Sequence, residues 1–355
     1  MTRILPPTIP RTASAYARRP GAVPYRRIAT EEAWITPELI KAYRELIARR
    51  PADEPGFMSM WGRFLDLGGV LLDRLLDMDA RRIAEMDASG IDLQLLLLTA
   101  PGVQVFPAAE AAAFAADSNE QLADAIRRHP TRFAGLAAIA PQDPPAAARE
   151  LERAVTRLGL KGAVINSHTK GEYLDDPRFW VIFEAAEALD VPIYIHPRPP
   201  SPAMLQPFLQ RGLDRALMGF GVEVAFHTLA IITSGALDRF PRLKLVIGHA
   251  GEGLPYWLYR LDYMQQHNRA AFKPELRRLP SDYLRDNIYV TTSGVAWAPA
   301  ITMAQSVLGI DRVLYAMDYP YQYQPGEVAA MDELPLGDAD KQLFFQGNAE
   351  RLFRL

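Results

Sequence analysis

The chain has 355 residues, of which 49% are hydrophobic, and its formal net charge is −3 at pH 7. This length can bury one large core or two ordinary ones, and the near-neutral charge argues against nucleic acid as a partner. Because cysteine is absent, disulfides, thiolate catalysis and cysteine-bound zinc are excluded. No apolar run reaches the roughly 18–20 residues of a membrane helix, so we expect no membrane contact and a cytoplasmic location.

Residues 1–26 differ in composition from the rest of the chain. Through residue 29 there are six arginines and no acid, a bias that also occurs in organelle transit peptides. Five prolines between Pro6 and Pro24 would break the amphipathic helix that such peptides form. We therefore expect a solvated or partner-contacting arm over residues 1–26, followed by one folded domain over residues 27–355.

Beyond the arm, apolar segments alternate with amphipathic ones. The pattern predicts strands at residues 27–32, 93–98, 133–140, 161–166, 192–196, 243–249, 287–293 and 313–318. It predicts helices at residues 36–49, 71–88, 108–129, 145–158, 177–189, 222–237, 254–266 and 298–308, and from 338 onward. Residues 50–69, with several prolines and glycines, are expected to form a long loop.

Strands that are apolar on both faces, nearly all followed by a helix, indicate a parallel sheet covered by helices. Eight such units predict an α/β fold of the (β/α)8 TIM-barrel type, with an insertion after the first strand. A doubly wound open sheet is the alternative, although no GxGxxG motif follows any predicted strand.

Several predicted strands end in side chains that can bind metals. The last strand stops at Asp318, and the Tyr319-Pro320 pair cannot continue it. Other strands end at Glu31, His196 and His249. At the C-terminal rim of a barrel these side chains would converge, and buried carboxylates repel one another without a cation. We predict a metal site, with a purely structural polar cluster as the alternative.

These strand ends resemble those of the amidohydrolase superfamily, in its branch of metal-dependent aromatic-acid decarboxylases. The matching motifs include RIATEEAW (27–34), PIYIHP (192–197), IGHAGEGLPYWLYRLDYM (247–264) and LYAMDYPYQY (314–323). Most amidohydrolases end their first strand in HxH, whereas this branch has ExA or ExH, represented here by Glu31 and Ala33.

The resemblance implies one divalent ion, Mn2+ or Zn2+, held by Glu31, His196 and Asp318. It makes Asp318 the acid that protonates the substrate ring and His249 a second catalytic residue. Candidate substrate-binding residues are Arg260 and Tyr321, which match family positions, and Trp61, Phe220 and Trp297, which could form an aromatic wall. For Phe220 and Trp297, simple core packing is an equal alternative.

The implied reaction is non-oxidative decarboxylation of an ortho-hydroxybenzoate, with 5-carboxyvanillate as the foremost candidate, in a homodimer or homotetramer. Two departures concern the substrate. Residues 58–76 lack an arginine that the family places there, for which Arg63 could substitute, and Ala230 stands where an arginine is usual. A hydrolase of a lactone or amide, a hydratase of an unsaturated acid and a non-enzymatic barrel protein are the alternatives.

Overall fold

The computed structural model describes residues 25–62, 64–67, 69–268 and 274–355. Its strands are all parallel to their sheet neighbours and follow one another in chain order. They are β1 (Ile28–Trp34), β2 (Leu93–Leu98), β3 (Phe133–Gly135), β4 (Ala137–Ala138), β5 (Ala163–Ile165), β6 (Ile193–Ile195), β7 (Leu245–Ile247), β8 (Ile288–Thr291) and β9 (Val313–Leu314). Every residue of these strands is buried.

The nine labelled strands form one closed barrel of eight. β3 and β4 are a single barrel strand, because Leu136 between them donates its N–H to the carbonyl of Leu96 in β2 at 2.9 Å. The ring closes where the N–H of Thr30 donates to the carbonyl of Tyr315 at 3.0 Å. An open sheet would leave these two ends apart, so the predicted (β/α)8 barrel is confirmed.

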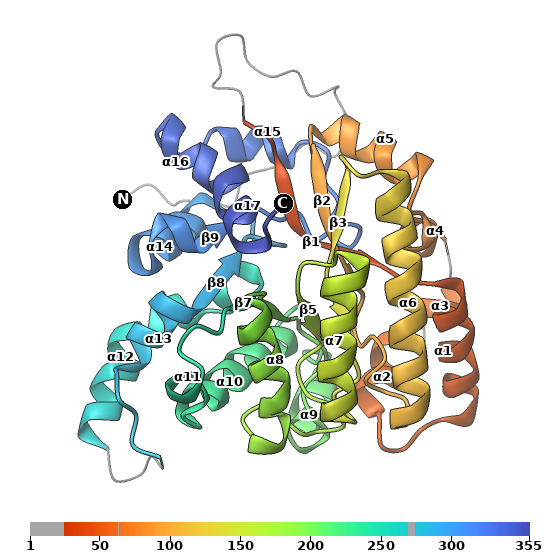
Figure 1. The fold of residues 1–355 in the computed structure, drawn as a ribbon, viewed down its shortest axis with the longest axis horizontal. Helices are drawn as coiled ribbons and strands as arrows, with labels where there is room; N and C mark the ends of the chain where they lie inside the picture. Colours follow the sequence, from red (N-terminus) through yellow and green to blue (C-terminus); the bar gives the residue numbers. More distant parts are fainter. Residues whose placement is uncertain (1–24, 63, 68, 269–273) are drawn as a thin grey trace.

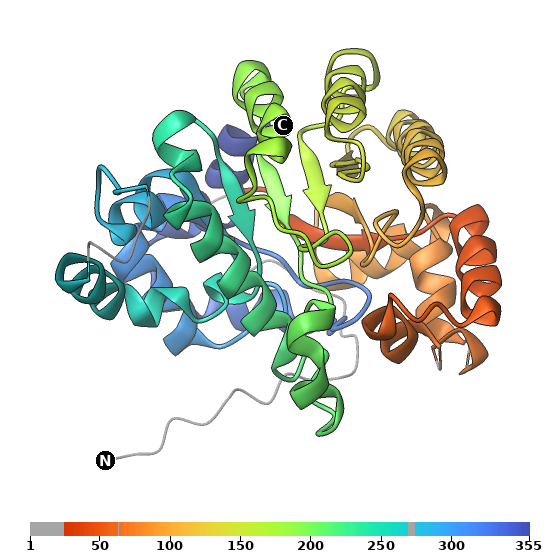
Figure 2. The ribbon, with the colours of Figure 1, turned by 90° about the horizontal axis from the view of Figure 1, so that it is seen from below.

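The helices lie around the strands, as Figures 1 and 2 show. They are α1 (Pro37–Arg49), α2 (Pro55–Trp61), α3 (Phe64–Leu67), α4 (Val70–Leu76), α5 (Ala80–Ser89), α6 (Ala108–Arg128), α7 (Pro144–Leu158), α8 (Trp180–Leu189), α9 (Pro202–Leu209), α10 (Gly219–Thr233), α11 (Ala236–Arg239), α12 (Leu254–His267), α13 (Pro280–Asn287), α14 (Ala298–Leu308), α15 (Glu327–Asp332), α16 (Asp338–Gln342) and α17 (Asn348–Phe353). In the described ranges, none is long and apolar enough to cross a membrane.

The helix bounds follow from local chemistry, as α7 illustrates. Asp143 caps its N-terminus by accepting the N–H of Ala146, and Pro144 occupies the first turn, where its missing N–H costs nothing. The helix ends at Gly159, whose φ of 75° is accessible to glycine without strain. Its buried residues, Ala147, Ala148, Leu151 and Ala154, lie on one face and pack toward the barrel.

Several expectations about the elements need correction. The segment 50–69, expected to be an irregular loop, contains α2 and α3, and α9, α13 and α15 were not anticipated. The helix expected at residues 71–88 is divided into α4 and α5. The predicted strand 313–318 pairs as a strand only at Val313–Leu314. Beyond Tyr315 the backbone N–H groups donate to side chains instead, since Ala316 donates to the hydroxyl of Thr292 at 3.1 Å and Met317 donates to Glu32 at 2.9 Å. Periodicity alone does not reveal such a change of partner.

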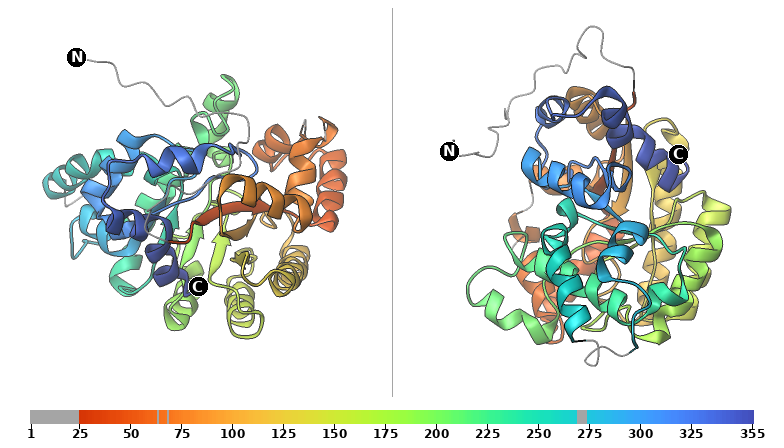
Figure 3. Two further views of the ribbon diagram at one scale, coloured as in Figure 1. Left: turned by 90° about the horizontal axis from the view of Figure 1, so that it is seen from above. Right: turned by 90° about the vertical axis from the view of Figure 1, so that its left-hand side faces the viewer.

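The two ends of the barrel are covered by different segments. The helices α15–α17 pack where the strands begin, and the backbone N–H of Tyr315 donates to the carbonyl of Phe344 at 3.2 Å. The helices α2 and α9 lie against each other at the opposite end, where the strands finish (Figure 3). The predicted arm, residues 1–26, lies outside the described residues except for Tyr25 and Arg26.

Candidate active site

Four of the predicted residues meet at the C-terminal rim of the barrel. Glu31 lies in β1, His196 follows β6, His249 follows β7 and Asp318 lies beyond β9. The Nε2 atom of His196 is 3.4 Å from Oε1 of Glu31, and Nε2 of His249 is 3.9 Å from the same oxygen. Asp318 is near enough to Glu31 and His249 for their charges to act on its pKa.

The two oxygens of the Glu31 carboxylate have different surroundings. Oε2 accepts hydrogen bonds from the hydroxyls of Tyr194, Thr291 and Ser293. Oε1 is buried and has no hydrogen-bond donor among the described residues. A Cβ atom at Gly248 would lie 2.8 Å from Oε2, so the glycine leaves the carboxylate room in this position. The carboxylate is therefore fixed on one side and open on the other.

Sequence reasoning missed Tyr194 and Thr291 as partners of Glu31. Side chains two apart on a strand share a face, so Tyr194 points to the same side as the predicted His196. Thr291 likewise lies two residues before Ser293, the last residue of the predicted strand 287–293, and so shares its face. The period of two was the signal that could have identified both.

The donor atoms fit a divalent ion. In the described part of the chain, no three His, Asp or Glu side chains are arranged to hold one as they stand. However, Oε1 of Glu31 is buried without a partner, which is costly unless a cation or donor matches it. Oε1 of Glu31 and Nε2 of His196 are 3.4 Å apart, close enough for both atoms to bind one ion. Asp318 would supply the third donor, after a shift of its side chain.

His249 is held in one orientation by its neighbours. His249, Ala250 and Glu252 have φ values of 52°, 57° and 53°, in the left-handed region that side-chain-bearing residues seldom adopt. This tight turn brings Oε1 of Glu252 to 2.7 Å from Nδ1 of His249. The Nδ1 hydrogen bond leaves Nε2 facing Glu31. The sequence did not single out Glu252, although its spacing of three from His249 places it within reach.

Asp318 also has a left-handed backbone, with a φ of 66°. The Glu32 carboxylate binds the residues before and after Asp318: it accepts the N–H of Met317 at 2.9 Å and the N–H of Tyr319 at 3.1 Å. Glu32 is completely buried. The ring of Tyr319 stacks on the guanidinium of Arg82, 4.6 Å from its carbon. The residues on both sides of Asp318 are thus fixed, and its side chain is directed by the backbone.

The site distributes charge unevenly. Burial raises the pKa of Asp318 to about 8, an effect that the His249 cation opposes. Burial lowers the pKa of His196 to about 4. Burial would also lower the pKa of His249, but the carboxylates of Glu252 and Glu31 raise it to about 10. Around neutral pH, without an ion, Asp318 thus holds a proton, His196 is neutral and His249 is a cation.

A cavity of about 480 Å3 opens directly onto these residues. Three predicted substrate-binding residues, Trp61, Phe220 and Tyr321, line it together with His196, His249 and Asp318. The hydroxyl of Tyr321 is 2.6 Å from that of Thr99, and Trp61 donates its indole N–H to the carbonyl of Ala100 at 2.9 Å. A larger hollow of about 860 Å3 lies where the strands begin and contains none of the predicted site residues.

Other predicted residues lie elsewhere. Arg260 is exposed on α12, Trp297 is 37% exposed before α14, and neither lines the cavity. Arg63 lies outside the described residues. Arg215 and Gln322, which the sequence did not single out, also line the cavity. The side chain of Gln322 hydrogen-bonds to Asp318.

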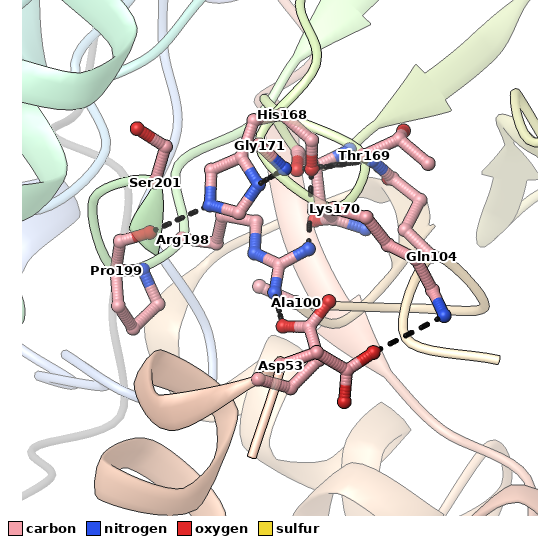
Figure 4. Close-up of polar contacts among 12 residues, drawn as sticks. Asp53, Ala100, Gln104, His168, Thr169, Lys170, Gly171, Arg198, Pro199 and Ser201 are labelled. Atoms are coloured by element: carbon pink, nitrogen blue, oxygen red, sulfur yellow. Dashed lines mark hydrogen bonds and ion pairs between the residues drawn. The ribbon is translucent and has the colours of Figure 1, made fainter. Parts of the chain in front are cut away.

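A buried polar network supports the rim on one side (Figure 4). Arg198, two residues after His196, forms an ion pair with Glu54 at 2.5 Å, and both side chains are at most 2% exposed. Arg198 also donates to the carbonyl of His168 at 3.1 Å. The amide of Gln104 donates to the same carbonyl at 3.1 Å. This network joins the insertion that contains α2 to the segments following β2, β5 and β6.

With this geometry established, comparison with known proteins becomes informative. A family model described as amidohydrolase matches residues 66–355. The chain therefore belongs to the amidohydrolase family, in its branch of aromatic acid decarboxylases.

Among its relatives, the gamma-resorcylate decarboxylase of Polaromonas sp. (strain JS666) is 37% identical over 293 residues, covering 80% of this chain and 90% of the relative. The 5-carboxyvanillate decarboxylase of Novosphingobium aromaticivorans is 49% identical, with a TM-score of 0.90 over 93% of this chain and 97% of that chain. That structure contains manganese and 3-methoxy-4-hydroxy-5-nitrobenzoic acid. The 5-carboxyvanillate decarboxylase of Sphingomonas paucimobilis is 42% identical, with a TM-score of 0.88 over 94% and 100% of the two chains.

Proposed function

We propose that this protein is a metal-dependent, non-oxidative decarboxylase of an ortho-hydroxybenzoate, with 5-carboxyvanillate as its substrate and vanillate as its product. The observation that carries the proposal is the meeting of Glu31, His196, His249 and Asp318 at one aromatic-walled cavity. The similarity to 5-carboxyvanillate decarboxylases over nearly the whole chain supports the substrate.

We assign Glu31, His196 and Asp318 as the residues that would hold a divalent ion. Bound there, the ion would supply positive charge that polarises the ring hydroxyl and draws electrons from the ring. Manganese is the first choice, because the compared Novosphingobium structure contains it. Zinc remains compatible with the same carboxylate and imidazole donors.

Asp318 is the proton donor in this mechanism. Its carboxyl group takes up the proton of the ring hydroxyl as the substrate binds and transfers it to the ring carbon that bears the departing carboxylate. A pair of ring electrons forms the new C–H bond. The bond from that carbon to the carboxylate then breaks, its electron pair restores the aromatic ring, and CO2 leaves. His249, cationic and fixed by Glu252, stabilises the anionic Asp318 that remains.

The walls of the cavity orient the ring. Trp61 and Phe220 offer apolar faces, and Tyr321 is held by Thr99 so that its own position is fixed. A rigid pocket keeps the acceptor carbon near Asp318 without an entropic cost at each turnover. The hydrolase and hydratase alternatives lose support, because the compared relatives are decarboxylases.

A homodimer is the assembly that we propose. The helix α12 exposes Tyr256, Trp257 and Tyr259 at 78%, 50% and 81%, and a cluster of large exposed apolar side chains marks an interaction surface. Arg260 lies on the same helix, so it would contribute to binding only from a second copy. Sedimentation equilibrium tests this assembly, with a monomer as the opposing result. We propose the cytoplasm as its compartment, which cell fractionation would test.

The function itself is tested with purified protein of known metal content. The protein is incubated with 5-carboxyvanillate, 2,6-dihydroxybenzoate, 2,3-dihydroxybenzoate and salicylate, and substrate absorbance and CO2 are followed together. We expect turnover of 5-carboxyvanillate that a chelator abolishes and added Mn2+ or Zn2+ restores. A metal-loaded protein that releases no CO2 from any of them would overturn the proposal.

A further inference from the structure

Arg215 stands at the active-site cavity without a charged partner. Among the described residues that line this cavity, it is the sole arginine or lysine, and the other charged or titratable groups are those of the candidate metal site and Tyr321. The side chain is exposed, and within the described ranges it forms no hydrogen bond or ion pair. Trp61, Phe64 and Phe220 form apolar parts of the same wall.

The position of Arg215 is fixed by its neighbours in the turn between α9 and α10. Asp214, 2% exposed, accepts the hydroxyl hydrogen of Ser59 in α2 at 2.5 Å. The carbonyl of Arg215 accepts the N–H of Met218 at 3.1 Å, and Gly219 closes the turn by donating to the carbonyl of Leu213 at 2.7 Å. The backbone of Arg215 is therefore anchored both to the insertion and to the start of α10.

A guanidinium at the rim of an apolar cavity favours a ligand with its own negative charge. Its planar fork matches the two oxygens of a carboxylate and holds it with paired hydrogen bonds. When the reacting carboxylate and hydroxyl of an aromatic substrate face Glu31, His196 and Asp318, the remaining ring substituents face the other walls. A second carboxylate on that ring could then pair with the guanidinium of Arg215 in the cavity wall.

We propose that Arg215 binds a second acidic group of the substrate and makes this decarboxylase specific for aromatic dicarboxylic acids. This inference rests on the proposed function and deepens it. The competing candidates are Arg63 and Arg260.

Two substrates that differ in one group test the assignment. 5-Carboxyvanillate has a second carboxylate, and 2-hydroxy-3-methoxybenzoate is the same ring without it. We measure kcat and KM for both with the wild type, R215M, R215K and the matched control R211M. Arg211 belongs to the same turn, but its guanidinium donates to the carbonyl of Pro207 at 3.0 Å and does not line the cavity.

The quantity compared is the ratio of kcat/KM for the dicarboxylic acid to that for the monocarboxylic acid. In R215M we expect this ratio to fall about 10- to 100-fold, mainly through KM, as for a lost charge-assisted hydrogen bond. R215K should retain part of it, and R211M should keep the wild-type value. An unchanged ratio in R215M, or a fall in R63M or R260M instead, overturns the assignment.

A binding measurement separates this inference from the proposed reaction. Calorimetry with vanillate, which keeps the second carboxylate, and with guaiacol, which lacks it, needs no turnover. If the wild type is inert but R215M weakens vanillate binding about 10-fold or more relative to guaiacol, the decarboxylase proposal fails and the carboxylate-binding role stands. If vanillate binding is also unaffected, both fail.

Discussion

Glu32 accepts the backbone N–H of Tyr319, the residue directly after Asp318, at 3.1 Å, while its other oxygen accepts the N–H of Met317, the residue directly before it, at 2.9 Å. The buried side chain of Glu32, in β1, therefore holds the backbone on both sides of Asp318, the candidate proton donor, in its left-handed conformation. A left-handed aspartate persists only where the surroundings determine it. The adjacent residue, Glu31, is a candidate metal ligand. The first of these two neighbouring carboxylates therefore faces the metal site, and the second holds the backbone around Asp318.

The first prediction concerns the two hydrogen bonds that Glu32 accepts from the residues flanking Asp318. In Glu32→Gln the amide NH2 would face one of the two N–H groups, so one hydrogen bond is lost and Asp318 is less well positioned. We expect kcat to fall about 10- to 100-fold with a smaller change in KM. The matched control is Glu327→Gln, which removes a buried carboxylate that accepts the hydroxyl of Tyr315 instead. Equal losses of kcat in both variants would contradict a specific role for Glu32.

The second prediction concerns the proton of Asp318. Asn keeps an oxygen that can coordinate an ion but has no proton to transfer, so Asp318→Asn should retain bound metal and lose at least about 100-fold in kcat. Metal content is measured by elemental analysis and turnover by CO2 release. Asp311→Asn, at a half-buried position outside the cavity, serves as the control. Substantial activity in Asp318→Asn would mean that another group donates the proton.

The third prediction is a pH dependence of stability. His227 accepts the N–H of Leu174 on Nε2, so its Nδ1 carries the proton and donates to Ser167. His227 is fully buried, and burial lowers its pKa from 6.5 to about 3. Between pH 6.5 and 3 the unfolded chain binds a proton there that the native protein does not.

The free energy of unfolding should therefore fall as the pH drops through this range, by roughly 1 kcal/mol per pH unit from this residue. His227→Gln should reduce that slope, and His267→Gln, on the exposed end of α12, should not. Urea unfolding at pH 7, 6 and 5 measures both slopes. A His227→Gln variant with the wild-type slope would show that the histidine is protonated in the native state.

The fourth prediction concerns the ion pair between Glu54 and Arg198. Removing one partner of a fully buried pair leaves the other charge without compensation, so Glu54→Met or Arg198→Met alone should cost about 3–5 kcal/mol. The double variant should cost less than either single change, because no charge is left behind. Urea unfolding of the three variants completes the cycle. Additive losses would mean that the two charges do not depend on each other.

Much of this architecture could be predicted from the sequence, for a definite reason. The strands are buried on both faces, so each appears as an apolar run, and the first polar residue after it identifies a rim position such as His196 or His249. The apolar pattern made the last strand too long in the prediction. Ala316 is apolar and so continued the pattern, but its N–H donates to a side chain and not to a neighbouring strand.

What the sequence could not provide are contacts between segments far apart in the chain. The backbone at Asp318 depends on Glu32, some 285 residues earlier, and no local pattern records that pairing. Arg215 was overlooked because its position depends on the bond between Asp214 and Ser59. Short helices such as α2 also escaped detection, since Pro55 and Gly56 are typical of loops as well as of helix starts.

Gly248 has a consequence for reading other genomes. A Cβ atom at this position would lie 2.8 Å from Oε2 and 3.1 Å from Oε1 of Glu31, so an alanine there would require the carboxylate to leave its present position. When this arrangement is sought in related sequences, the glycine before the histidine is therefore a criterion in addition to the acids and imidazoles themselves.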